Sequence, residues 1–309
     1  MGLYDLKNKF LKNEIDKPEY IKKMHDCHKH LFEYAAFIAD TDIGKIEISN
    51  NKVVMTTRRD GIKLICDMND HRIIPVEIIN LGEYESDDIY VFKKIIKEYI
   101  IPHEKLSMLD VGANIGWFSL NVGKDVRDGR ICSFEPVPKT YGYLTENVKL
   151  NNLNNIETFN FGFSNENKEI DFYYYKEGSG NASLSNVSDN SEVEVVKSSV
   201  RTLDSFVSEE KMKVNIIKCD VEGAELFVFQ GGVETLKRDK PIVFTEMLRK
   251  WAKKFNYHPN DIIDFFSGMG YGCYVVKDYK LISFDRVNDD TLETNYFFIN
   301  KEKYNNIIG

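Results

Sequence analysis

The segment 108–120, MLDVGANIGWFSL, joins an apolar strand to the first turn of a helix through a turn with two glycines. A backbone that passes close to a bound ligand needs residues without side chains, and Gly112 and Gly116 supply them. The spacing is D-x-G-x-x-x-G, which differs from the G-x-G-x-x-G pattern of dinucleotide-binding turns. The segment therefore predicts a ligand-binding strand, turn and helix.

Acidic residues stand at the ends of two consecutive predicted strands. Asp110 closes the strand before the glycine turn, and Glu135 closes the strand 130–136, roughly twenty residues later. The Asp110 carboxylate would repel a pyrophosphate but attract an ammonium or a sulfonium group. Glu135 stands where doubly wound folds bind ribose hydroxyls. Together they indicate a nucleoside with a positively charged tail, which matches S-adenosylmethionine.

The first 80 residues predict a small α+β appendage. Residues 4–40 carry an interrupted helical stripe, so we expect one or two helices there. Residues 46–58 and 61–68 alternate in the period of strands, which favours a small antiparallel sheet.

From about Leu81 the chain predicts a parallel sheet covered on both faces by helices. A helix is expected over 89–100, and a hairpin between Ile170 and Val200. Further strands are predicted at 156–164, 214–220, 241–247, 271–276 and 295–300, and further helices at 224–237 and 260–270.

The charge and the cysteine content disfavour a nucleic-acid-binding protein, a disulfide-rich protein and a protein with a thiolate zinc site. The net charge of -8 comes without a lysine and arginine block, which disfavours a nucleic acid partner. The five cysteines are scattered and form no C-x-x-C pair, so we expect no disulfide framework, no thiolate zinc site and a cytoplasmic location. No apolar run reaches the length of a membrane span or a signal core.

Several motifs occur together in order: GEYES, LDVGANIGWFSL, SFEPVP, LTENVKLNNLNN, RTLDSF, IIKCDVEGAELFVFQGG and PIVFTEM. With them the chain resembles the FkbM family of S-adenosylmethionine-dependent methyltransferases from about Leu81 to Asn300. The resemblance implies a Rossmann-like class I methyltransferase fold, with a seven-stranded, mostly parallel sheet whose last strand is antiparallel. It also implies a methyltransferase domain over 81–309 and an N-terminal extension over 1–80.

The expected cofactor site surrounds the glycine turn. Backbone of the turn would contact the methionine moiety, Asp110 would reach its ammonium directly or through water, and Glu135 would bind the ribose. The resemblance places Glu85 close to the cofactor, although an acid that caps the next helix would look the same. The residues expected to bind S-adenosylmethionine are Glu85, Asp110, Gly112, Ala113, Asn114, Gly116, Glu135 and Pro136.

Three residues are candidates for the reaction itself. Asp220 follows a strand opposite the glycine turn and would orient or deprotonate the acceptor, unless it caps the next helix. Glu246 is the second candidate, unless it pairs with a nearby lysine or Arg249. His258 is the alternative base, unless it serves only at a helix entry. If that helix began at Glu222, Glu222 and Glu225 would share one of its faces.

We expect no metal ion in this site. Asp220, Glu222 and Glu246 nevertheless offer oxygen ligands for a divalent cation.

The resulting hypothesis is an O-methyltransferase that acts on a hydroxyl of a sugar, or of a nucleotide-activated sugar, in surface-polysaccharide or secondary-metabolite biosynthesis. The alternatives are an inactive module that binds S-adenosylmethionine and a nicotinamide-dependent oxidoreductase, which Asp110 disfavours. The expected partner is a small-molecule acceptor. The helical stripe between Tyr20 and Ile38 leaves a homodimer possible.

Overall fold

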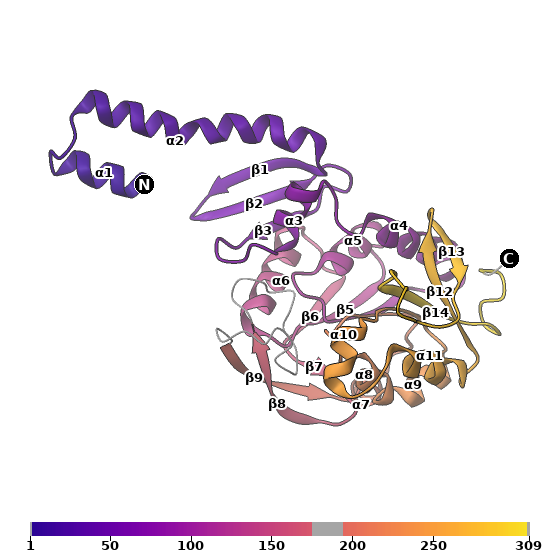
Figure 1. Cartoon of the computed structure of the whole chain (residues 1–309). Helices are drawn as coiled ribbons and strands as arrows, with labels where there is room; N and C mark the ends of the chain where they lie inside the picture. The colour runs from indigo at the N-terminus through magenta and orange to yellow at the C-terminus, as the bar shows by residue number, and fades with distance from the viewer. Residues whose placement is uncertain (1, 175–193, 308–309) are drawn as a thin grey trace.

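The computed structural model of the chain describes residues 2–174 and 194–307 (Figure 1). A central sheet holds eight strands: β4 (Ser107–Val111), β5 (Arg130–Phe134), β6 (Ile156–Phe159), β10 (Ile216–Cys219), β11 (Ile242–Glu246), β12 (Tyr271–Lys277), β13 (Lys280–Ser283) and β14 (Asn295–Asn300). Their order is β13-β12-β14-β11-β10-β4-β5-β6. The last five strands of this order are mutually parallel, and β14 runs antiparallel to both its neighbours.

Helices cover both faces of this sheet. They are α3 (Ile74–Leu81), α4 (Ser86–Ile95), the π-helix η2 (Ile96–Ile100), α5 (Trp117–Asp125), α6 (Pro138–Leu150), α7 (Leu203–Glu209), α8 (Glu225–Gln230), α9 (Val233–Asp239), α10 (Arg249–Ala252), the 3-10 helix η4 (Lys253–Phe255) and α11 (Pro259–Ser267). The core divides into one apolar cluster with α4, α5 and α6 and another with α7, α8, α9 and α11. The strands are therefore buried on both sides, as parallel strands usually are.

Successive side chains of a strand point to opposite faces of the sheet, and this decides which side chains of β4 and β10 lie next to each other. Met108 belongs to the cluster on the α5 face, whereas Leu109 and Val111 belong to the opposite cluster. Asp110 therefore points to the α5 face. In the register of β4 and β10 its partner is Lys218, which follows Ile216 on the same face.

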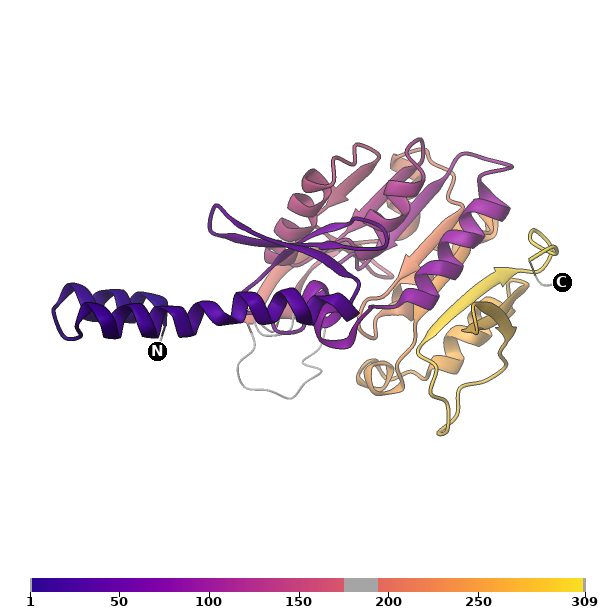
Figure 2. The same cartoon turned by 90° about the horizontal axis from the view of Figure 1, so that it is seen from above.

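The N-terminal part combines a helical hairpin with a small sheet. It comprises α1 (Leu3–Leu11), α2 (Lys17–Phe37), the 3-10 helix η1 (Ile38–Asp40), β1 (Ile43–Ser49), β2 (Lys52–Thr57) and β3 (Lys63–Cys66). Helix α2 extends away from the body of the molecule (Figure 2). The antiparallel sheet β1-β2-β3 instead packs on the body, and its apolar residues join the α5-face cluster.

Asn147 of α6 and Asn151, which caps the carboxyl end of α6, form hydrogen bonds with the edge strand β3. Asn151 accepts a hydrogen bond from the Lys63 amide at 2.9 Å and donates to the Lys63 carbonyl at 2.8 Å. One turn earlier, Asn147 accepts from the Ile65 amide at 2.9 Å and donates to the Ile115 carbonyl at 2.9 Å. These amides take the place of a further strand, so the small sheet is bonded to the larger domain through side chains.

The expected α/β class and the antiparallel last strand are confirmed. Strand β13 extends the expected seven-stranded sheet to eight. The strand expected over 156–164 was wrong, because it divides into β6 and β7 (Gly162–Phe163). Strand β7 joins β8 (Lys168–Tyr174) and β9 (Glu194–Arg201) in a separate sheet, in which β8 and β9 form the expected antiparallel pair.

The single helix expected over 224–237 was also wrong. It divides into α8 and α9 at Gly231 and Gly232. A Cβ at Gly231 would lie 2.2 Å from the Ser164 carbonyl oxygen, so close backbone packing fixes a glycine there.

Among the described residues, every helix is either too short or too polar to cross a bilayer.

Replacing Asn147 with alanine tests the attachment of the small sheet. We expect Asn147→Ala to lower the free energy of unfolding by about 2–4 kcal/mol, because the buried Ile65 amide and Ile115 carbonyl both lose their partner. Urea denaturation measures the change. The matched control is the exposed Asn154, whose replacement by alanine should stay within about 0.5 kcal/mol of the parent. Equal stability of the two variants would contradict this role.

Candidate active site

The site lies where four parallel strands end. The carboxyl ends of β4, β5, β10 and β11, with the turns that follow them, carry Asp110 to Gly116, Glu135, Asp220 to Gly223 and Glu246. In open α/β sheets, ligands bind at this edge.

The glycine turn (residues 112–116) packs between two of the other strand ends. Gly112 and Ala113 donate their amides to the Phe134 carbonyl at 3.1 and 2.8 Å. Gly112 has a φ of +72°, and a Cβ there would lie 1.8 Å from the Asp220 carbonyl oxygen. Asn114 and Gly116 also have positive φ, at 51° and 96°. Because Gly112 has no side chain, its backbone can pack directly against the Asp220 backbone. This contact joins the glycine turn to the turn after β10.

Glu135 ties the glycine turn to the loop after β5. Its carboxylate accepts the Asn114 amide at 3.1 Å and the Val137 amide at 2.9 Å. The side chain is buried, and that burial raises the pKa of Glu135 to about 7, even though both amides favour its charged form. The carbonyls of Glu135 and Pro136 both accept from the Asn160 amide group, which fixes the loop.

Asp110 is fully buried and already bonded. Its Oδ2 atom accepts from the Ser119 amide at 3.1 Å and from the Ser119 hydroxyl at 2.5 Å. Its Oδ1 atom lies 3.6 Å from Lys218 Nζ. Oδ2 is therefore held by Ser119, whereas Oδ1 has no hydrogen-bond partner among the described residues, and the expected contact with the cofactor's ammonium, directly or through water, stays a prediction.

Lys218 lies at the centre of the site, although the sequence analysis did not single it out. Its ammonium group is almost wholly buried, donates to the Gly112 carbonyl at 2.7 Å and lies 3.5 Å from Asp220 Oδ2. Asp220 and Asp110 raise the pKa of Lys218 against the opposing effect of burial, so it stays charged. The available signal was a lone lysine inside the apolar strand IIKC.

Glu85 lies beside this group of charges. It has a left-handed φ of 45° directly before α4, but its side chain makes no capping bond, so the helix-cap alternative fails. Burial, together with the negative charge of Asp220, raises the pKa of Glu85 to about 8. The preceding Tyr84 stands edge-on to Trp117, with ring centroids 6.1 Å apart.

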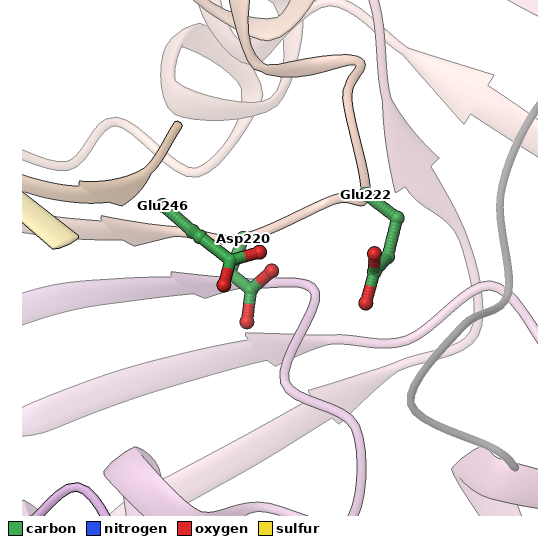
Figure 3. Close-up of side chains that lie close together, drawn as sticks. All are labelled: Asp220, Glu222 and Glu246. Atoms are coloured by element: carbon green, nitrogen blue, oxygen red, sulfur yellow. The ribbon is translucent and has the colours of Figure 1, made fainter. Parts of the chain in front are cut away.

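Three carboxylates form an acidic cluster, defined as Asp220, Glu222 and Glu246 (Figure 3). One oxygen from each lies within 4.8 Å of the others. Burial and the charge of Asp220 raise the pKa of Glu246 to about 10 and that of Glu222 well above its usual range. Such oxygens could hold a divalent cation.

Glu225 fixes the loop that carries Asp220 and Glu222 by accepting backbone hydrogen bonds from it. It is buried and accepts the Val221 and Gly223 amides at 3.0 Å each, while the Tyr257 hydroxyl donates to it at 3.1 Å. Helix α8 begins only at Glu225, so the condition under which Glu222 and Glu225 would share a helical face is not met. Asp220 is not the cap of that helix either, since Ala224 stands at that position.

Hydrogen bonds and ion pairs of Arg249 and His258 bear on two alternatives from the sequence analysis, the pairing of Glu246 with Arg249 and the helix-entry role of His258. Arg249 pairs with Asp289 at 2.9 Å, so it is not the partner proposed for Glu246. His258 is exposed and caps α11, accepting the Asn260 amide through Nδ1 at 3.2 Å. The structure therefore gives His258 the helix-entry role, and it is not brought into the acidic cluster.

Comparison with known families decides what kind of site this is. Residues 110–273, more than half of the chain, match the sequence model of the Methyltransferase FkbM domain. The chain belongs to the FkbM family of methyltransferases. This family depends on S-adenosylmethionine, so the expected cofactor is confirmed.

Curated relatives of this FkbM domain cover parts of the chain. Methyltransferase 1 of Beauveria bassiana is 29% identical over 142 residues, which are 40% of this chain and 57% of that protein. Methyltransferase sdnD of Sordaria araneosa is 27% identical over 50% of this chain and 74% of its own length. The AMB antimetabolite synthetase AmbE of Pseudomonas aeruginosa is 26% identical over 52% of this chain and 9% of its own length. The chain thus spans less than two thirds of Methyltransferase 1 and a small part of AmbE.

Solved structures are similar at lower identity. Methyltransferase FkbM from Methylobacillus flagellatus aligns with a TM-score of 0.42 and 14% identity over 71% of this chain and 52% of that chain. A methyltransferase from Agrobacterium tumefaciens aligns with a TM-score of 0.43 and 9% identity over 82% of this chain and 70% of that chain.

The glycine turn of this FkbM domain fits S-adenosylmethionine. Asn114 Oδ1 and Trp117 Nε1, an acceptor and a donor, are buried without a hydrogen-bond partner within the described part of the chain. Buried polar atoms are nearly always paired, so these two suit a polar ligand. Each Glu135 oxygen accepts one amide and keeps a lone pair for a ribose hydroxyl.

The pKa of Glu135 predicts how cofactor affinity depends on pH. The ionised carboxylate accepts ribose hydroxyls, and it takes up a proton as the pH falls through about 7. Calorimetry should therefore show S-adenosylmethionine binding about tenfold more weakly at pH 6 than at pH 8. Glu135→Gln should bind weakly at both pH values. A parent and variant with the same pH dependence would rule out Glu135 as the titrating group.

Proposed function

We propose that this FkbM domain transfers a methyl group to a hydroxyl oxygen. When bound, S-adenosylmethionine supplies a methyl group activated by a sulfonium. The observation that supports the proposal is the acidic cluster, which stands at the ends of β10 and β11 while the Asp220 backbone touches Gly112 of the glycine turn. An acceptor held by the cluster would lie within reach of a cofactor on that turn.

The cofactor residues divide into two proposed groups. Glu135 and the backbone of Gly112, Ala113 and Asn114 form the direct contacts, with Gly116 and Pro136 shaping the turn and the loop. Asp110 forms the second group, and its Oδ1 atom would reach the ammonium directly or through water, since only its Oδ2 atom is hydrogen-bonded to Ser119. Glu85 faces the positive charge of the cofactor, since its side chain is free of the capping role.

The members of the acidic cluster suit two different tasks. Asp220 has a side chain that is 36% exposed and lies 3.5 Å from the Lys218 ammonium, so its carboxyl group can contact both Lys218 and an acceptor. Glu246, with a pKa of about 10, carries a proton at neutral pH and can donate a hydrogen bond. We propose that Asp220 accepts the acceptor's proton while Glu246 orients its oxygen.

The charge of the cluster narrows the acceptor class. A phosphate placed next to three carboxyl groups would meet repulsion and lose its hydration. We therefore favour a neutral sugar-like hydroxyl at the reacting end, with the phosphates of any activated sugar held away from the cluster. An acceptor that carries an ammonium group beside the hydroxyl is the second candidate, because the ammonium could pair with a carboxyl group of the cluster and favour its ionised form.

These proposals bear on the pathway in which the enzyme acts and on its location in the cell. A small-molecule acceptor agrees with the name of one relative, an antimetabolite synthetase, and with an expected role in secondary-metabolite or surface-polysaccharide assembly. We keep the cytoplasm as the proposed location, because all five cysteines are free thiols.

Asp220→Asn tests the proposed base. We expect turnover to fall at least tenfold with little change in cofactor affinity, because the amide keeps the shape but cannot take up the proton. Turnover is measured by transfer of label from S-adenosylmethionine, and affinity by calorimetry. The control is Asp128→Asn, an exposed acid before β5 that should leave both quantities unchanged. Loss of cofactor binding in Asp220→Asn would move this residue out of the acceptor site.

A panel of acceptors tests the acceptor class. Neutral sugars, amino sugars and nucleotide sugars are incubated with labelled cofactor, with and without a chelator, and the label is located by mass spectrometry. We expect label on oxygen, with neutral or amine-bearing acceptors preferred and the chelator without effect. Preference for nucleotide sugars would contradict the charge argument. Loss of activity with the chelator would instead assign the cluster to a metal ion.

A further inference from the structure

Helix α2 is unusual because none of its 21 residues is buried in the described chain. Its first half is sheltered by α1, which folds back on it. Phe10 and Tyr20 stack with ring centroids 4.5 Å apart, and Leu6 of α1 is buried. Figures 1 and 2 both show α2 extending from the body, joined to it at its carboxyl end.

The second half of α2, His28–Phe37, is exposed at every residue, and we call it the open half. It carries four large apolar side chains: Leu31, Phe32, Tyr34 and Phe37 are 56%, 73%, 47% and 54% exposed. A helix gains most of its stability in a protein from packing its apolar side chains. An apolar surface gathered on a protruding helix marks an interaction site.

The charge of the hairpin limits the kind of partner. Residues 3–37 contain 7 lysines and 6 acidic residues, and the two kinds are interspersed along the sequence. Anionic membranes and nucleic acids are bound by clustered basic residues, which the hairpin lacks. Its near-neutral charge allows two copies to approach, although the whole chain carries -8.

The exposed area fits a weak dimer. Leu31, Tyr34 and Phe37 are three residues apart and share one helical face, whereas Phe32 points to another side. From their exposed fractions, the three side chains on this face offer on the order of 250 Å² of apolar surface. Since an interface core is about 65% apolar, this corresponds to roughly 400 Å² per copy, which lies in the range of weak interfaces.

We propose that a second copy of this chain covers the open half of α2, so that two copies pair through these helices about a two-fold axis. Such an axis uses the same surface twice, so one helix supplies both sides of the interface. The acceptor and cofactor sites lie in the body of each copy, and this proposal is independent of the proposed reaction.

Sedimentation of the full chain tests the dimer. At about 50 µM, well above a Kd in the micromolar range, the parent should sediment with twice the chain mass. Leu31→Glu/Tyr34→Glu should sediment as a monomer, because two charges on the same helical face would be buried in each half of the interface. The control is Leu292→Glu, which places the same charge on a side chain that is 89% exposed elsewhere and should remain dimeric.

Two outcomes would overturn the proposal: a monomeric parent, or a double variant that stays dimeric. If the parent is monomeric, its binding to vesicles of anionic lipid would show that α2 contacts a membrane instead. Calorimetric binding of S-adenosylmethionine shows that each variant is folded. Phe37→Glu is the second variant, and it should raise the dimer dissociation constant at least tenfold if the double variant proves unstable.

Discussion

The active-site edge of this protein depends on one buried ammonium group. Lys218 holds the Gly112 carbonyl and stands between Asp110 and Asp220, so a single positive charge serves two carboxylates and a backbone turn. Without it, two acids would face each other in a region of low dielectric. Breaking a buried ion pair costs about 3–5 kcal/mol, which is a large part of the stability of a domain. The arrangement of β4 and β10, the glycine turn and the acidic cluster all require this charge to be in place.

Much of the architecture could be predicted from the sequence, because it depends on local patterns. The glycine-spaced turn, the apolar strands and the motif order gave the α/β class, the antiparallel last strand and the family. The acids at the strand ends were also predicted, since parallel strands bring their carboxyl ends to one edge. Asp220 and Glu246 do lie within one cluster, although the sequence separates them by more than twenty positions.

What could not be predicted depends on contacts between distant residues. The division of 224–237 into two helices follows from the approach of the Ser164 carbonyl to Gly231, and no local pattern shows that approach. Lys218 reads as a polar interruption of a strand until the register with Asp110 is known. His258 next to a proline is compatible with catalysis or capping, and only its bond to the Asn260 amide distinguishes them. The asparagines of α6 read as family features, while their bonds to β3 explain how the first 80 residues are attached.

The contact between Gly112 and the Asp220 backbone has a consequence for engineering. Residues 110–116 and 218–225 contact each other through backbone and through Lys218, so substitutions there disturb the glycine turn and the acidic cluster at once. The segment from Leu248 to Tyr257 is partly exposed and made of short helices, and it follows Glu246 directly. A library that aims to change acceptor range while retaining methyl transfer would therefore diversify this segment and leave residues 110–116 and 218–225 unaltered.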